Sequence, residues 1–204
     1  MRDKKVLEMT SMAMFIALIA VMALVPYLGF IQVFAISATI IHTPVIIGTL
    51  FGGRKVGLGL GLAFGLSSWI VAMMRASTPF DLMFLNPILS VVPRIIFGLS
   101  IWYIFVLVNR LVKNKTASIA LTFVLSTLLH TVLVMGTALV LSPFYEEVLG
   151  EALFQFIITT LPAIALLEIV FATLVGTPIV MRLMQADLFN EQRQETLQQL
   201  RKES

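Results

Sequence analysis

Residues 88–108 read ILSVVPRIIFGLSIWYIFVLV, an apolar run with one basic residue, Arg94, in its middle. A helix needs about 20 such residues to cross the hydrocarbon core of a bilayer, so this run is long enough to span it. An ionised side chain at membrane depth must face protein or water and find a partner there. We therefore expect Arg94 to mark a functional site.

The composition also indicates a membrane protein. Of the 204 residues, 59% are hydrophobic and 12% are charged, whereas about 25% of the residues of a soluble domain are charged. Six apolar stretches follow one another, at residues 7–25, 36–51, 56–74, 88–108, 117–141 and 153–184. We expect an all-α membrane protein, a six-transmembrane-helix bundle that forms one domain over residues 1–186, followed by a polar cytoplasmic tail over residues 187–204.

The second stretch is unusual because it is short. It follows Pro26 and Gly29 and contains Pro44, which predicts a tilted or broken helix. We expect residues 26–33 to form a loop that packs against protein at the outer face.

The orientation follows from the basic residues, most of which fall on one side of the membrane if six helices alternate. These residues are Arg2, Lys4, Lys5, Arg54, Lys55, Arg110, Lys113, Lys115, Arg182, Arg193, Arg201 and Lys202. The other side carries Arg75, Asp81 and an acidic loop with Glu146, Glu147 and Glu151. The positive-inside rule then places both termini in the cytoplasm, and the net charge of +3 reflects topology with no nucleic-acid patch.

Enzyme chemistry finds little support in the polar residues. The chain has no cysteine, which excludes disulfides, thiol chemistry and Cys-ligated metals. His42 and His130 are the only histidines, and we expect them at different depths, with His42 in a structural or interface role on the inner half of its helix. No H-E-x-x-H pattern or phosphate-binding loop is present, so we expect no catalytic residue, metal or cofactor.

Small residues recur at helical spacing in two stretches. Gly57, Gly61 and Gly65 share one helix face, which predicts close packing against another helix. Ala13 and Ala17 lie one turn apart in the first stretch, a pattern that by itself is typical of internal helix packing.

Four segments together resemble one family. These are PYLGFIQ at residues 26–32, TIIHTPVIIG at 39–48, GLGLGLAFGL at 57–66 and PRIIFG at 93–98. They look like the substrate-binding S component of an energy-coupling factor (ECF) vitamin transporter, most of all the pantothenate-specific ones. The resemblance covers essentially the whole chain and extends to its size and expected spans.

The resemblance implies a substrate-binding subunit in a prokaryotic plasma membrane that is itself no enzyme. Such a subunit captures a vitamin at the outer face and docks on a transmembrane coupling subunit that carries two ATPase subunits. It then topples in the bilayer to release the vitamin inside. The family's Ala-x-x-x-Ala motif, which contacts the coupling subunit, maps onto Ala13 and Ala17.

The polar groups of the outer half indicate the kind of ligand. We expect Arg94 to bind an anionic group, and Asn86 and His130 to bind a polar body. The expected apolar walls and lid are Tyr27, Phe30, Trp69, Phe80 and Phe84. This set suits pantothenate, which has a carboxylate, an amide and two hydroxyls.

Several alternatives stay open. Arg94 could pair with Glu168 and only hold two helices together, and Trp69 is equally typical of an interfacial belt. The vitamin could be pyridoxine, hydroxymethylpyrimidine, riboflavin or folate. A self-sufficient secondary transporter could relay protons through Arg94, Glu168 and His130, although the two halves show no convincing repeat.

Overall fold

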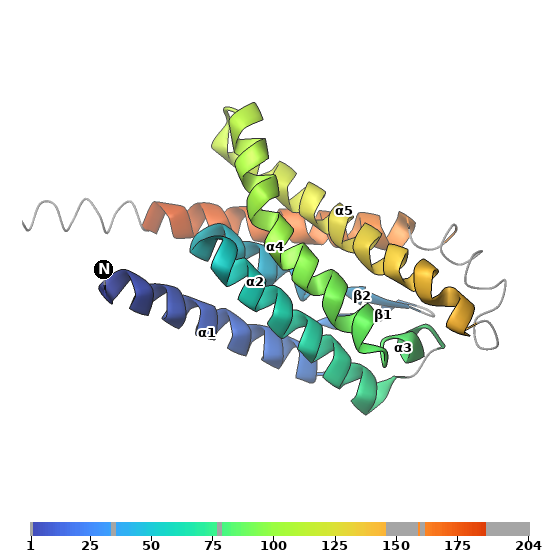
Figure 1. Cartoon of the computed structure of the whole chain (residues 1–204). Helices are drawn as coiled ribbons and strands as arrows, with labels where there is room; N and C mark the ends of the chain where they lie inside the picture. Colours follow the sequence, from blue (N-terminus) through green and yellow to red (C-terminus); the bar gives the residue numbers. More distant parts are fainter. Residues whose placement is uncertain (1, 34–35, 77–78, 146–158, 160–161, 187–204) are drawn as a thin grey trace, which may run out of the picture.

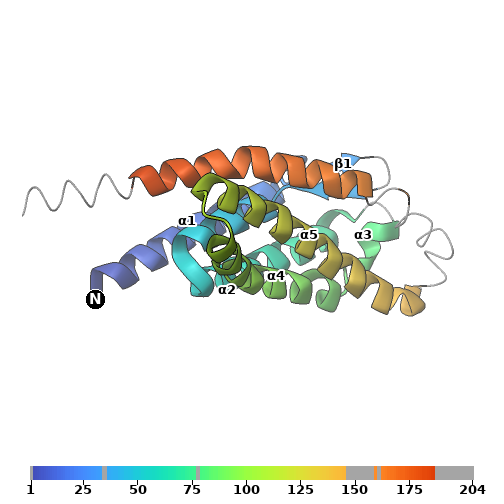
Figure 2. The ribbon, with the colours of Figure 1, turned by 90° about the horizontal axis from the view of Figure 1, so that it is seen from above.

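The protein is a bundle of long helices, and its computed structural model describes residues 2–33, 36–76, 79–145, 159 and 162–186 (Figure 1). The long helices are α1 (Arg2–Leu24), α2 (His42–Arg75), α4 (Pro87–Leu111), α5 (Lys115–Leu141) and a C-terminal helix that is described over Pro162–Ala186. A short helix, α3 (Pro79–Met83), precedes α4, and a 3-10 turn, η1 (Ser142–Tyr145), follows α5. The C-terminal helix lies on the opposite side of the bundle from α4 (Figure 2).

The helices have the length and surface of a membrane protein. Among the described residues, α2, α4, Lys115–Phe144 and Pro162–Ala186 are long and apolar enough to cross a bilayer, and α1 contributes a shorter apolar helix, Glu8–Leu24. Large apolar side chains such as Leu166 and Leu174 face outward, while Ser90, Thr122 and Ser126 are fully buried. Apolar outside and small polar inside is the pattern of helices packed in lipid, so the chain is an all-α membrane protein.

A break divides α2 into two helices. Gly53 has φ 78° and ψ −172°, inside the range His42–Arg75. Residues 42–52 rise only about 16 Å at about 1.5 Å per residue, which is less than the roughly 30 Å of a hydrocarbon core. The prediction that the second helix is short is therefore confirmed, and the break at Gly53 falls between the second and third expected helices. Glycine is the residue that tolerates this backbone at low cost.

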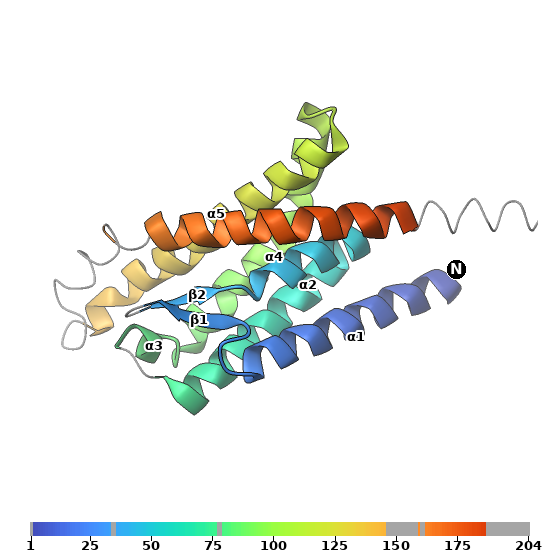
Figure 3. The same ribbon diagram turned by 180° about the vertical axis from the view of Figure 1, so that it is seen from behind.

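The prediction that residues 36–51 are all helical is wrong at their start. Ile36–Thr39 is a strand, β2, which pairs antiparallel with β1 (Phe30–Val33) with Phe30 opposite Thr39. The loop expected over residues 26–33 thus ends in β1. Figure 3 shows this hairpin beside the C-terminal helix, toward the end of the bundle away from the N-terminus. A short run rich in β-branched residues fits a strand as well as a helix, so periodicity could not decide between them.

The glycine face of α2 packs directly against α4, as predicted. A Cβ added at Gly61 would lie 2.4 Å from the Arg94 carbonyl oxygen, and one at Gly65 would lie 2.9 Å from the Val91 Cα. A Cβ at Gly57 would lie 2.5 Å from the Gly98 carbonyl oxygen. The backbone that carries Arg94 is therefore held against α2 at a distance that only glycine permits.

We expect Gly61→Ala to destabilise the bundle, because its methyl group meets fixed backbone of α4 and overpacking costs about 1–3 kcal/mol. Gly136→Ala on α5 is the matched control, since a Cβ there meets no described atom within 4 Å and alanine favours helix. Thermal unfolding of both variants in detergent tests this. Equal midpoints for Gly61→Ala and Gly136→Ala would contradict the close α2–α4 packing.

Candidate functional site

A cavity of about 370 Å³ opens among the helices and the hairpin, within the size range of small-molecule sites. Its charged lining, within the described part of the chain, consists of Arg75, Asp81, Arg94 and Glu168. The remaining lining residues are Pro26, Tyr27, Phe30, Thr39, Ser68, Val71, Ala72, Ala76, Phe84, His130, Thr131, Val134, Met135, Ile164 and Ala165. Two cations and two anions in a mostly apolar wall suit a ligand with a few polar groups.

Arg94 is buried, with 2% of its surface exposed, and its position follows from the residue before it. Pro93 lies inside α4 and has no N–H, so it cannot bond the carbonyl four residues earlier, which belongs to Leu89. Nη1 of Arg94 donates to that Leu89 oxygen at 2.6 Å. The proline thus frees an acceptor that anchors one arm of the guanidinium.

The rest of the guanidinium faces aromatic rings and the cavity. Its carbon Cζ lies 4.9 Å from the ring centre of Phe84 and 5.6 Å from that of Phe64, both close enough for a cation–π interaction. Nε is buried and has no hydrogen-bond partner among the described residues. Arg94 therefore brings its positive charge to the cavity lining and retains one buried donor, Nε, without a partner among the described residues.

The two histidines form a stacked pair. The ring centres of His42 and His130 are 5.4 Å apart with an interplanar angle of 15°. Phe64 stacks on His130 at 5.5 Å, and Phe97 meets it edge-on at 5.0 Å. The prediction that the histidines lie at different depths is wrong, because the hairpin lets α2 begin at His42 inside the bundle. His42 therefore lies beside a residue of the cavity lining without lining the cavity itself, and the structural or interface role expected for it stays a prediction.

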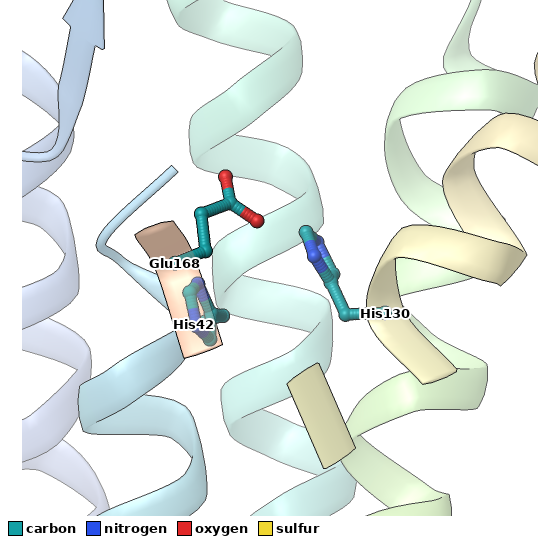
Figure 4. Close-up of side chains that lie close together, drawn as sticks. All are labelled: His42, His130 and Glu168. Carbon is teal, nitrogen blue, oxygen red and sulfur yellow. The ribbon is translucent and has the colours of Figure 1, made fainter. Parts of the chain in front are cut away.

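Glu168 joins this pair from the C-terminal helix (Figure 4). It is buried, and its Oε1 accepts a hydrogen bond from the backbone N–H of Thr39 at the end of β2. One ligand atom from each of Glu168, His42 and His130 lies within 4.8 Å of the others. Within the described residues, no ion pair in direct contact joins Glu168 to Arg94, so the structure does not support a contact ion pair that only fastens helices.

The polar atoms of this cluster are largely unpartnered. Neither ring nitrogen of His42 or His130 has a hydrogen-bond partner of ordinary geometry within the described part of the chain, although the backbone of Thr39 lies near His42. An unsatisfied buried polar group costs about 1–3 kcal/mol, so native proteins retain few of them without a water or ligand.

Two histidines and a glutamate are also ligands of transition metals, but the arrangement fits a metal poorly. Zinc bonds of about 2.0–2.2 Å require ligand atoms closer together than 4.8 Å. The guanidinium of Arg94 shares the cavity with His130 and Glu168 and would oppose a further cation. The positive charge of Arg94, more than the spacing of the ligand atoms, therefore argues against a metal ion in this cluster.

The structure brings most of the predicted site residues together. Arg94, His130, Tyr27, Phe30 and Phe84 all line the cavity. The side chain of Phe80 and the acidic loop at Glu146, Glu147 and Glu151 lie outside the described residues, as does the tail at 187–204.

Asn86 and Trp69 do not line the cavity but hold the turn that leads into α4. Asn86 caps α4, as predicted, by accepting from the Ile88 N–H at 2.9 Å. Trp69 Nε1 donates to the Leu85 carbonyl at 2.9 Å. Both side chains therefore support the segment that carries Phe84.

Sequence reasoning did not place Glu168 or Arg75 in the site. Glu168 is the single acidic residue within residues 153–184, the same signal that singled out Arg94. Arg75 lines the cavity while its Nη2 donates to the Ala23 carbonyl at 2.6 Å. Its position in the last turn of α2 did not indicate that its side chain lines the cavity.

Comparison with known proteins gives a consistent result. A family described as "ECF transporter, substrate-specific component" matches residues 7–184. The "Pantothenic acid transporter PanT" of Lactococcus lactis subsp. cremoris is 27% identical over 201 residues, covering 91% of this chain and 98% of that protein. The "Pantothenate transporter PanT" of Leuconostoc mesenteroides subsp. mesenteroides is 31% identical over 119 residues, covering 56% and 57%.

We expect the Phe84 ring and the Arg94 guanidinium to be energetically coupled. In a double-mutant cycle with Phe84→Leu and Arg94→Met, the interaction free energy should be about 0.5–2 kcal/mol in equilibrium unfolding in mixed micelles. Phe123→Leu, a buried ring on α5, combined with Arg94→Met is the control and should be additive. A coupling near zero for the Phe84 cycle would show that the cation–π contact contributes nothing.

Proposed function

The chain belongs to the substrate-specific components of ECF transporters, and we propose that it is the membrane subunit that binds pantothenate for ATP-driven import. As such a component it binds and delivers a vitamin and is not an enzyme. The observation that carries the proposal is Arg94, a buried guanidinium with an unpartnered donor at the wall of a cavity of about 370 Å³. Both relatives above are transporters named for pantothenate, which supports the same ligand.

Arg94 is the proposed partner of the ligand's carboxylate. Its charge has no contact partner among the described carboxylates, and one arm is fixed by the Leu89 carbonyl. A guanidinium held in this way is oriented before the ligand arrives, so little side-chain entropy is lost on binding. The aromatic rings of Phe64 and Phe84 keep water from the charge, which strengthens its attraction to an anion.

The remaining lining suits the uncharged body of pantothenate. Phe84, Val71, Val134 and Ile164 offer apolar surface for methyl and methylene groups. Tyr27 and Phe30 lie at the start of the hairpin and are proposed to cover the ligand. His130 and Thr131 supply donors and acceptors for its amide and hydroxyl groups.

The family further implies the assembly in which this subunit works. We propose six spans with both termini in the cytoplasm of a prokaryotic cell, a transmembrane coupling subunit and two ATPase subunits as partners. Ala13 and Ala17 lie on an exposed face of α1, where small side chains let another helix approach closely. They are the proposed contact with the coupling subunit.

We expect Arg94→Ala to remove the preference of the protein for a carboxylate. The purified wild-type chain should bind pantothenate far more tightly than panthenol, the alcohol that lacks the carboxylate, in calorimetric titrations. Losing the buried charge pair should cost about 2–5 kcal/mol of binding free energy, at about 1.4 kcal/mol per tenfold change in Kd. In Arg94→Ala the two ligands should bind about equally.

Arg75→Ala is the matched control, because Arg75 is the other cation in the described cavity lining. It should keep the preference for pantothenate. If Arg75→Ala loses the preference and Arg94→Ala retains it, the carboxylate lies at Arg75. If a folded sample binds riboflavin, folate, pyridoxine or hydroxymethylpyrimidine instead, the ligand is wrong while the family stands.

We expect uptake of pantothenate into proteoliposomes to require the coupling subunit, both ATPases and ATP. Ala13→Trp and Ala17→Trp should abolish uptake by blocking helix approach and leave pantothenate binding unchanged. Met14→Trp, on an exposed position of the same helix, should retain uptake. Concentrative uptake by the chain alone would instead indicate a secondary transporter.

A further inference from the structure

The cluster of His42, His130 and Glu168 is not explained by carboxylate binding at Arg94. His130 and Glu168 line the cavity, and His42 lies behind them, stacked on the His130 ring. We propose that these three residues form a hydroxyl-binding subsite, in which His42 and Glu168 are specificity-determining residues for the hydroxyl-bearing end of the ligand. This inference rests on the proposed function, because it assigns the second end of the same ligand.

Unpartnered nitrogen atoms are the first observation that points to a ligand. His42 and His130 together hold four buried ring nitrogens that lack hydrogen-bond partners among the described residues. A neutral imidazole has one donor and one acceptor, and a hydroxyl has one donor and two acceptor positions. A hydroxyl can therefore accept from a histidine N–H and donate to the Glu168 carboxylate at the same time.

The spacing of the cluster supports a hydrogen-bonded group. Three atoms up to 4.8 Å apart surround a point about 2.8 Å from each, which is the length of a hydrogen bond to oxygen. Figure 4 shows the Glu168 carboxylate directed toward His130, with His42 below it. An oxygen atom bound at that point would require the two rings to move slightly apart, because their nitrogens are closed to a water-sized group in this structure.

Charge determines which end of the ligand this subsite accepts. Glu168 repels a carboxylate, whereas Arg94 attracts one. Both residues therefore favour the orientation in which the carboxylate of an anionic ligand lies at Arg94. The Phe64 ring contacts both the Arg94 guanidinium and the His130 ring. The carboxylate end thus binds at Arg94 and the hydroxyl end at Glu168.

The subsite is also held in place before a ligand binds. The Thr39 N–H fixes one oxygen of Glu168 and leaves the other available. The His130 ring is stacked between His42 and Phe64 and supported at its edge by Phe97. Such a polar site rejects an analogue that lacks the hydroxyl, because its own polar groups then stay unpaired.

The test compares pantothenate with its two single-deoxy analogues, in each of which one hydroxyl is replaced by hydrogen. Wild-type protein should bind pantothenate roughly 10- to 100-fold more tightly than at least one of them. His42→Phe, which keeps a planar ring for stacking, should reduce that ratio at least about fivefold. Glu168→Gln, which preserves size, should do the same even if its affinity for the anion rises. The ratio is the readout, since a purely structural role would weaken all three ligands together.

Thr127→Val is the matched control, because it replaces a buried, unpartnered hydroxyl on α5 outside the described cavity lining. It should leave the ratio unchanged. If pantothenate binds but both His42→Phe and Glu168→Gln keep the wild-type ratio, the hydroxyl subsite is wrong. Zinc or nickel binding that His42→Phe abolishes would make the cluster a metal site and also overturn it. A folded wild-type chain that binds no pantothenate would instead refute the proposed function on which the inference rests.

Discussion

The bond between Arg94 and the Leu89 carbonyl is the interaction on which the site depends. It exists because Pro93 leaves that carbonyl without its usual helical partner, so α4 can offer an acceptor from its own backbone. The same turn of α4 lies against Gly61, whose missing side chain allows the Arg94 carbonyl to approach α2. A proline and a glycine thus fix the depth and direction of one charge, and neither of them belongs to the described cavity lining.

The arrangement also explains how a charged cavity is stable in a bilayer. The described lining balances Arg75 and Arg94 with Asp81 and Glu168, so it has no large net charge. Balance without direct pairing between Arg94 and Glu168 keeps both groups available for opposite ends of a polar ligand. In a contact ion pair, the two charges would satisfy each other and would bind the polar groups of a ligand less strongly.

The amino-acid pattern was sufficient for the all-α membrane class and for the buried position of Arg94. A basic residue amid apolar ones indicates a site regardless of its neighbours, and the glycine spacing required a close helix contact. The hairpin could not be predicted, because Ile36–Thr39 has no periodicity that separates strand from helix. Because the hairpin was missed, His42 was predicted at the wrong depth and away from His130. Asn86 and Trp69 were predicted to bind the ligand from their position near the outer face alone. That position does not show whether a side chain turns toward the cavity or toward the backbone.

The point at which the hairpin ends and α2 begins has a further electrostatic consequence. Because β2 ends at Thr39, helix α2 begins within the bundle, and its first turn lies next to Glu168. The peptide dipoles of a helix sum to about half a positive charge at its N-terminus. Glu168 is therefore stabilised in part by a helix end, a partner that requires no additional basic residue inside the membrane. Because the dipole of α2 stabilises the Glu168 carboxylate, Glu168 does not need Arg94 as its partner. The guanidinium can then bind the proposed ligand.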